Sequence, residues 1–153
     1  MALRVNSQLP SLEGVAQWMN GAVASDELRG HPVLFNFWAL SCPCCLRNLP
    51  RLHHWREQYA DQGLQIIAVH LPMRPADDNP DAVRAALQER DITDPCALDH
   101  DGLLAARFET EGVWPYYFLF DAQGTMRSRA AGRTGLQLLE KALQRNLALS
   151  ATA

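Results

Sequence analysis

The chain has 153 residues, of which 48% are hydrophobic and 20% are charged, so it is long enough to bury a core of its own and is neither disordered nor fibrous. Its formal net charge of −3 gives no basic footprint for nucleic acid, and no polybasic helix indicates a membrane surface. We therefore expect a single domain over residues 1–153 that acts as a monomer on small molecules or protein thiols, with neither nucleic acid nor membrane as partner.

The N-terminus carries no apolar h-region, and the longest apolar runs are far shorter than a membrane span. As given, the sequence predicts a soluble, cytoplasmic protein. A chain trimmed of its leader would read the same way, and its compartment would then be periplasmic or otherwise extracytoplasmic. A CxxC pair fits either compartment, so the cysteines do not decide between them.

The sequence predicts a lead-in followed by a buried strand over residues 1–39. Residues 1–32 form the lead-in, in which Leu12, Val15, Trp18 and Met19 have helix-like spacing, so we expect a short helix and then a turn. Residues 33–39 are continuously apolar except for Asn36, which suits a strand buried on both faces.

A long helix is predicted from residue 43 to about residue 60. Its apolar residues recur at spacings of three and four and so share one face: Leu46, Leu49, Leu52, Trp55 and Tyr59. Pro43 suits the first helical position, where its missing N–H costs nothing. Pro50 lies inside the helix and should bend it there, because it removes one backbone hydrogen bond.

The rest of the chain alternates strands and helices. Strands are predicted over 64–70, 113–120 and 125–131, and helices over 81–90 and 135–149. Residues 94–98 are at most a short strand, and 99–102 form a turn or a helix start that leads into 103–108. The first two strands of the chain, joined by a long helix, should be parallel, and the last two should form a β-hairpin. This order predicts an α/β fold in which a mixed central sheet has helices on both faces.

Three of the four cysteines follow the first strand, and their spacing limits which of them can pair. Cys44 and Cys45 are adjacent, with Cα atoms ~3.8 Å apart, which is below the ~4.4 Å minimum usual for a disulfide. Cys42 and Cys44 should point to nearly opposite sides at a helix start. Cys42 and Cys45 face one another across one turn, so we expect this pair to cycle between dithiol and disulfide.

The two paired cysteines should differ in reactivity. Cys42 lies at the predicted helix N-terminus, where unpaired N–H groups favour a thiolate and lower the pKa of a cysteine. We expect Cys42 to be the attacking nucleophile and Cys45, deeper in the helix, to resolve the mixed disulfide. The role of Cys44 is left open: it could be a third redox thiol, a metal ligand or a residue with no role. The isolated Cys96 is expected to be a buried apolar thiol.

Several motifs together resemble the thioredoxin superfamily, and more specifically its TlpA/ResA-like thiol-disulfide oxidoreductases, over about residues 10 to 145. The motifs are Phe37-Trp38-Ala39-x-x-Cys42-x-x-Cys45 with Pro50 after it, Gly112-Val113-Trp114-Pro115, and Phe118-Leu119-Phe120-Asp121-x-x-Gly124. The resemblance implies a thioredoxin-like fold in which 72–98 is a TlpA-type insertion of a helix and a short strand. It also implies disulfide exchange that needs no bound cofactor, only a redox partner that resets the CxxC pair.

The resemblance also assigns substrate-binding residues. Pro115 is expected to be a cis-proline beside the disulfide, which would bring the backbone of Trp114 close to Cys42, where an extended substrate peptide could pair with it. Trp38 is expected in the apolar wall of the site. For both tryptophans, ordinary core packing is the alternative interpretation.

The sequence departs from the family's active-site motif at two positions. Ser41 replaces a tryptophan before the first cysteine, and Cys44 replaces a proline between the two, so redox potentials cannot be transferred from relatives. Asn36 stands where thioredoxin has a proton-relaying aspartate, and it cannot relay a proton. His70 ends the second strand and is a hypothetical proton acceptor for Cys45.

Two other functions remain open from the sequence. Three clustered thiols could hold a soft ion such as copper or zinc on the same fold, although no fourth ligand stands at metal spacing and we predict no metal site. Peroxide reduction is disfavoured because the Pro and Thr of a peroxiredoxin loop are missing ahead of the cysteines.

Overall fold

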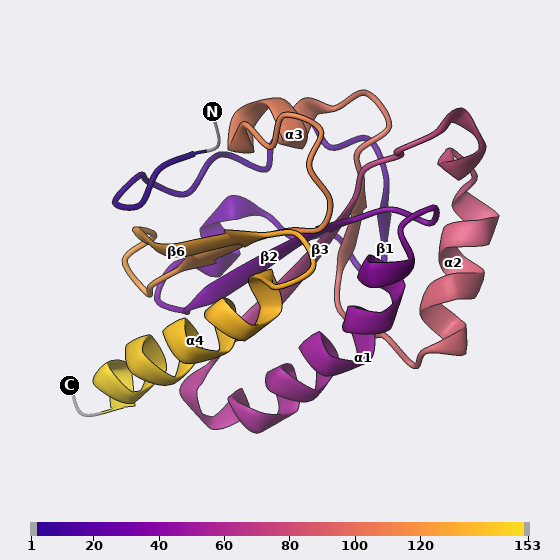
Figure 1. The fold of residues 1–153 in the computed structure, drawn as a ribbon. Coiled ribbons are helices and arrows are strands. Elements are labelled where there is room, and N and C mark those ends of the chain that lie inside the picture. The colour runs from indigo at the N-terminus through magenta and orange to yellow at the C-terminus, as the bar shows by residue number, and fades with distance from the viewer. Residues whose placement is uncertain (1–2, 152–153) are drawn as a thin grey trace.

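A computed structural model describes the backbone of residues 3–151 and the side chains of residues 3–147. Six strands form one mixed sheet in the order β1-β4-β3-β2-β5-β6 (Figure 1). The strands are β1 (Trp18–Met19), β2 (Val33–Trp38), β3 (Gln65–His70), β4 (Cys96–Leu98), β5 (Tyr116–Phe120) and β6 (Met126–Ala131). The mixed sheet that the sequence predicts is therefore confirmed.

Helices cover both faces of this sheet. They are α1 (Pro43–Gln58), α2 (Pro80–Glu89), α3 (Leu103–Phe108) and α4 (Gly135–Ala151), with 3₁₀ turns at Ser25–Leu28, Ala60–Gln62 and Pro75–Asp77. In Figure 1, α1, α2 and α4 lie on one side of the sheet, and α3 lies on the other side with part of the lead-in. Within residues 3–151, no helix is both long enough and apolar enough to span a membrane.

The central strand β2 is buried on both faces, as its apolar run predicts. Phe35 and Phe37 pack with Phe108 of α3 on one face, at ring-centroid distances of 4.8 and 5.1 Å. Leu34 and Trp38 point to the opposite face, where α1, α2 and α4 pack. This two-sided burial holds the C-terminal end of β2 firmly, and the cysteines follow directly from it.

Strand pairing brings three loops together at one end of the central strands. β2 and β3 are parallel, as predicted, and their register places Trp38 beside His70. β5 is antiparallel to β2, with Tyr116 opposite Phe37. The loops that follow β2 and β3 and the loop that precedes β5 therefore meet at the N-terminus of α1, where the candidate site lies.

The short helix predicted in the lead-in does not form. Trp18 and Met19 instead make strand β1, which pairs antiparallel with Ala97 and Cys96 of β4. Gly14 has a φ of +95°, a conformation that ends any helical turn between Leu12 and Trp18. The prediction was wrong because helix-like spacing cannot reveal that a distant strand edge is available for pairing.

Helix α1 begins at Pro43 and contains Pro50, both as predicted. In Figure 1 its axis changes direction between the N-terminal turns and the rest of the helix. Since a proline cannot donate a backbone hydrogen bond, Pro50 accounts for this bend.

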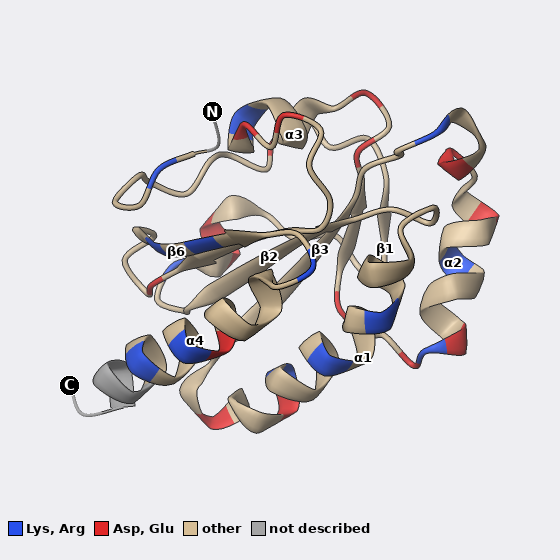
Figure 2. Cartoon of the chain, in the orientation of Figure 1, with Lys and Arg blue, Asp and Glu red and all other residues tan. Residues whose placement is uncertain are grey.

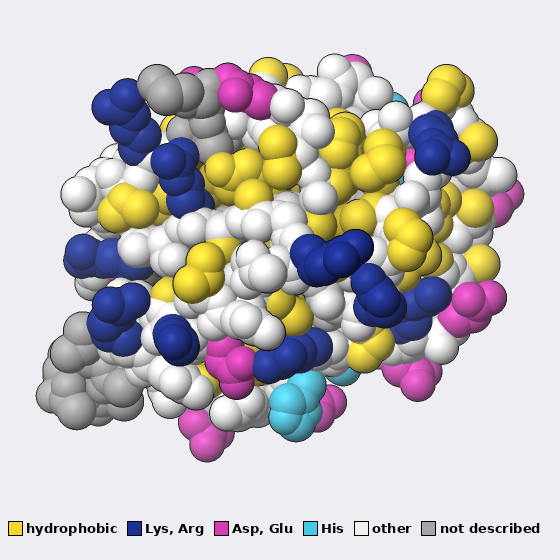
Figure 3. Space-filling model, in the orientation of Figure 1, with side chains coloured by type: hydrophobic (Ala, Val, Ile, Leu, Met, Phe, Trp, Pro, Cys, Tyr) yellow, Lys and Arg dark blue, Asp and Glu magenta, His cyan; other side chains and the backbone are white. Residues whose placement is uncertain are grey.

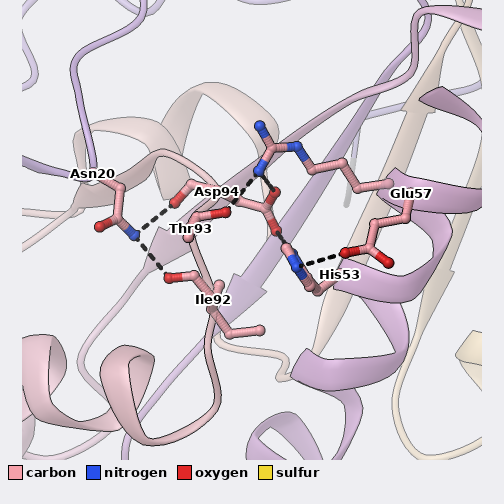
Figure 4. A network of polar contacts seen from close by, with 7 residues as sticks. Asn20, His53, Glu57, Ile92, Thr93 and Asp94 are labelled. Atoms are coloured by element: carbon pink, nitrogen blue, oxygen red, sulfur yellow. Dashed lines mark hydrogen bonds and ion pairs between the residues drawn. The ribbon is translucent and has the colours of Figure 1, made fainter.

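A polar network ties the C-terminal half of α1 to the segment that precedes β4 (Figure 4). The carboxylate of Asp94 is 4% exposed and lies 3.0 Å from Arg56 and 3.7 Å from His53. His53 therefore faces a buried carboxylate rather than open solvent. The amide of Asn20 donates to the carbonyls of Ile92 and Asp94, both at 3.1 Å, which extends the network to the lead-in.

Candidate active site

A disulfide joins Cys42 and Cys45 at the start of α1, with their Cα atoms 5.2 Å apart. The pairing predicted from their spacing is thus the pairing found. Cys42 is the N-cap of the helix, and its sulfur accepts a hydrogen bond from the backbone N–H of Cys45 at 3.2 Å. A thiolate at this position would keep that donor and face the other unpaired N–H groups of the first turn, which stabilise negative charge.

Cys44 is not part of the disulfide and is half-buried. The Asn48 amide lies 3.7 Å from its sulfur and also donates to the Tyr117 hydroxyl at 2.8 Å. Burial raises the pKa of Tyr117 to about 12, Asn48 lowers it in part, and Cys44 raises it. The hydroxyl therefore keeps its proton at neutral pH, and Cys44 lies beside a neutral polar pair.

His70 lies behind the turn that carries the cysteines. Its Nε2 accepts a hydrogen bond from the backbone N–H of Leu40 at 3.3 Å, and its ring meets Trp38 edge-on at 4.8 Å. Burial lowers the pKa of His70 to about 4, and the nearby Asp77 opposes that shift only in part. The ring is therefore a neutral, weak base at pH 7, which favours a structural role over the hypothetical role of proton acceptor for Cys45.

Asp77 is a buried acid of the site that sequence reasoning missed. Its carboxylate accepts hydrogen bonds from the Ser41 hydroxyl and from the backbone N–H groups of Met73, at 2.9 Å, and Arg74, at 3.1 Å. Burial raises the pKa of Asp77, but these hydrogen bonds outweigh it, so the pKa lies below its usual value. The sequence did hold a signal, because Asp77 ends a turn opened by Pro75, where an Asp side chain often binds backbone N–H groups.

Trp38 and Asn36 belong to the interior. The Trp38 side chain is completely buried between the sheet and the site, and Asn36 is 2% exposed. Trp38 shares the apolar cluster of Cys42 and Cys45, and its complete burial fits the core-packing alternative, while contact of its ring with a substrate stays a prediction.

Trp114 and Pro115 lie at the surface end of β5, next to the cysteines. The Trp114–Pro115 peptide bond is cis. The half-buried Trp114 ring packs against the apolar cluster that contains Cys42 and Cys45, and its Nε1 donates to the carbonyl of Leu71 at 2.9 Å. The indole therefore connects the loop after β3 to the active-site wall.

The comparisons with known proteins agree with this geometry. A family model described as the AhpC/TSA family matches residues 5–129. The chain belongs to the AhpC/TSA family. It is 37% identical over 147 residues to the thiol-disulfide oxidoreductase YkuV of Bacillus subtilis, and the match covers 95% of this chain and 98% of that protein.

Solved structures support the fold assignment. A thioredoxin-like protein determined in its oxidised form in solution superposes with a TM-score of 0.86 at 36% identity, covering 95% of this chain and 98% of the other. The thioredoxin-like superfamily protein SPOA0173 superposes with a TM-score of 0.75 at 22% identity, covering 94% and 96%, and shows the fold alone. Family, fold and the Cys42–Cys45 disulfide together support thiol-disulfide exchange as the activity.

The chain also matches one part of some larger proteins. It is 34% identical over 122 residues to the protein DipZ of Mycobacterium tuberculosis, and the match covers 77% of this chain but 17% of DipZ. The likeness therefore concerns a single segment of such larger proteins.

Other features of this AhpC/TSA member lie apart from the disulfide. Burial raises the pKa of Cys96 to about 12, so this thiol is inert at neutral pH, in line with the predicted buried thiol. Among the described residues, no three His, Cys, Asp or Glu side chains are grouped to hold a metal ion. A cavity of about 490 Å³ opens beside Val33 and Phe120, at the end of β2 opposite to the cysteines.

Proposed function

We propose that the reduced protein transfers two electrons through Cys42 and Cys45 to a disulfide, which lies either in another protein or between two small thiol compounds. The Cys42 thiolate attacks one sulfur of the substrate disulfide, which forms a mixed disulfide and releases the first substrate thiolate. The Cys45 thiolate then attacks the Cys42 sulfur, which closes the Cys42–Cys45 disulfide and releases the second thiolate. Each released thiolate takes a proton, and a reducing partner must then restore the dithiol.

The observation that carries this proposal is the placement of the disulfide at the head of α1. Cys42 is 6% exposed and Cys45 is 1% exposed, so an incoming sulfur reaches Cys42 first. Cys42 also has the helix N-terminus to stabilise its thiolate, while Cys45 lies one turn deeper. The related proteins YkuV and ResA are named thiol-disulfide oxidoreductases, which supports disulfide exchange as the type of reaction.

The proposal is tested by trapping. Protein reduced with dithiothreitol and then desalted is mixed with insulin as the disulfide substrate. We expect Cys45→Ser to accumulate a mixed disulfide through Cys42, because the resolving sulfur is missing. Cys42→Ser should lose turnover by at least about a hundredfold, since Cys42 occupies the N-cap of α1 and is the more exposed sulfur of the pair. Mass spectrometry of the trapped adduct and insulin turbidity provide the two readouts.

Cys44→Ser is the matched control, because it removes a neighbouring thiol and leaves the pair intact. Turnover that survives in Cys42→Ser and disappears in Cys44→Ser would assign the attack to the wrong sulfur and overturn the proposal. Metal analysis of the purified protein accompanies the assay. Stoichiometric copper or zinc that Cys42→Ser abolishes, with no turnover by the unaltered protein, would favour the thiolate metal-binding alternative.

A further inference from the structure

The segments that surround the disulfide have a charge opposite to that of the whole chain. Three segments meet there: residues 38–48, which carry the cysteines, 112–117 around the cis-proline, and 131–136 at the end of β6. Together they contain Arg47 and Arg133 and no Asp or Glu, whereas the chain has a net charge of −3. The charged side chains of these three segments are therefore both basic, whereas the adjoining stretches carry the buried Asp77 after β3 and Glu109 and Glu111 just before Gly112.

Arg47 is exposed on α1, three residues after Cys44. Other arginines of the same helix are neutralised, because Arg51 lies 2.6 Å from Glu140 and Arg56 lies 3.0 Å from Asp94. Within the part of the chain that the structure describes, Arg47 has no such carboxylate. Its guanidinium is therefore free to meet a charge on another molecule.

Arg133 stands next to the cis-proline. The backbone N–H of Gly132 donates to the carbonyl of Pro115 at 2.9 Å, and Arg133 follows Gly132 directly. The side chain is exposed, and it too lacks an ion-pair partner among the described residues. The two free guanidiniums thus flank the site from α1 and from the connection between β6 and α4.

Apolar side chains make up the rest of this face. Leu40, Leu46 and Trp114 pack against the cluster that holds the two active cysteines, and Val113 is 40% exposed beside them. Figure 2 shows basic positions on α1 and at the β6–α4 connection. Figure 3 shows a hydrophobic patch on the same face, bordered by basic side chains over these two elements, with acidic side chains gathered mainly toward the edges of the view.

We propose that this face selects protein disulfides that are flanked by acidic residues, with Arg47 and Arg133 as the specificity-determining residues. The inference rests on the disulfide exchange proposed above and adds the chemistry of the partner. Charge complementarity of this kind mainly speeds association and fixes orientation, and it is weakened by salt. The apolar patch would hold the substrate backbone near Cys42, while the arginines select the charge beside the disulfide.

The test uses three cyclic peptides of one sequence, closed by a disulfide, that carry Glu, Gln or Lys on both sides of one cysteine. The reduced full chain is mixed with each peptide, and the second-order rate constant is measured by acid quench and mass spectrometry. An exposed ion pair changes a rate by up to about fivefold. We therefore expect the Glu peptide to react about tenfold faster than the Lys peptide, with the difference shrinking in 0.5 M salt, a condition that shortens the Debye length to about 4 Å.

The variants assign the effect to residues. Arg47→Gln combined with Arg133→Gln should slow the Glu peptide to within about twofold of the Gln peptide and leave the Gln peptide unchanged. Arg145→Gln is the matched control, because Arg145 is also exposed but is distant from the site. It lies ten residues after Gly135, the first residue of α4, which corresponds to about 15 Å along the helix. It should leave all three rates unchanged.

The outcomes separate the two proposals. Equal rates for the three peptides, or equal losses on the Gln and Glu peptides in the double variant, overturn the acidic preference and leave disulfide exchange standing. Failure of the reduced chain to react with any of the peptides overturns the exchange itself, and the preference with it.

Discussion

The imidazole of His70 is enclosed by the residues that shape the active-site turn. It accepts the Leu40 N–H on one side and meets the Trp38 ring on the other, with no exposed area of its own. A protonated Nε2 could no longer accept that hydrogen bond, and the charge would be buried. The ring is therefore neutral in the folded protein over a wider pH range than in the unfolded chain.

This difference predicts how stability depends on pH. Burial lowers the pKa of His70 to about 4 in the folded state, against 6.5 for the ordinary group. The stabilisation from the neutral ring is thus complete above pH about 6.5 and is lost as the pH falls toward 4, at most about 3 kcal/mol. His70→Gln keeps an acceptor for Leu40 but cannot titrate. Urea unfolding of both proteins from pH 7.5 to 4 should show the unaltered protein losing up to about 3 kcal/mol of unfolding free energy relative to His70→Gln.

Carboxylates without an interaction with His70 titrate alike in both proteins and cancel in that difference, whereas Asp77 and Asp78 interact with its charge and do not cancel fully. Asp94 and Asp99 have pKa values raised chiefly by burial, and the stabilisation linked to their protonation is lost as the pH rises, opposite in sign to the effect of His70. A difference between the two proteins that stays constant from pH 7.5 to 4 would contradict the account of His70.

At the scale of one residue, the sequence predicted which cysteines react better than it predicted the contacts that surround the other residues of the site. The spacing of Cys42 and Cys45 was sufficient to predict their pairing, because one helical turn brings two such sulfurs together. The contacts of His70 with Leu40 and of Asp77 with Ser41 could not be predicted, since they join residues thirty or more positions apart in the sequence. Only the folded chain shows that Asp77 fixes the turn at Ser41.

At the scale of elements, β2 was predictable from its continuous apolar run, and α1 and α4 from apolar residues that recur with the helical period over the whole element. The lead-in was not predictable, since β1 has two residues and exists only because β4 offers an edge to pair with. The Asp94 network is similar: its members come from α1, the lead-in and the segment before β4, and none of them forms a local motif.

This network predicts that an ion pair of α1 matters for stability. Arg56→Gln should lower the free energy of unfolding by about 1–3 kcal/mol, because it leaves the carboxylate of Asp94 buried without its nearest cation. Arg84→Gln is the control. Arg84 lies 2.9 Å from Asp81, but that carboxylate is 90% exposed, so the loss should stay within about 0.5 kcal/mol. Urea denaturation at pH 7 measures both, and equal losses would refute the role given to the Asp94 network.

The whole molecule consists of layers around one sheet, and these layers set the position of the active site. The face with Phe35 and Phe37 is closed by α3 and the lead-in, and the opposite face by α1, α2 and α4. The cysteines lie at the end of the central strand and the N-terminus of α1, in an apolar cluster that also holds Val83 and Leu87 of α2, and the loops after β2 and β3 and before β5 meet beside them. Stability therefore comes mainly from the two buried faces, and reactivity from the uncovered end of the sheet.

A pair of adjacent leucines on α4 tests this separation of stability from reactivity. Leu139 is fully buried against the sheet, whereas its neighbour Leu138 is 62% exposed. Leu139→Ala should lower the free energy of unfolding by about 2–5 kcal/mol, because it removes buried methyl groups and leaves a cavity. Leu138→Ala should change it by less than about 0.5 kcal/mol, since the side chain is mostly in water. Both folded variants should react with a disulfide substrate at the rate of the unaltered protein, because α4 contributes no atom to the Cys42–Cys45 pair. If Leu139→Ala instead lowered both the stability and the rate of the folded protein, the packing of α4 would also shape the site.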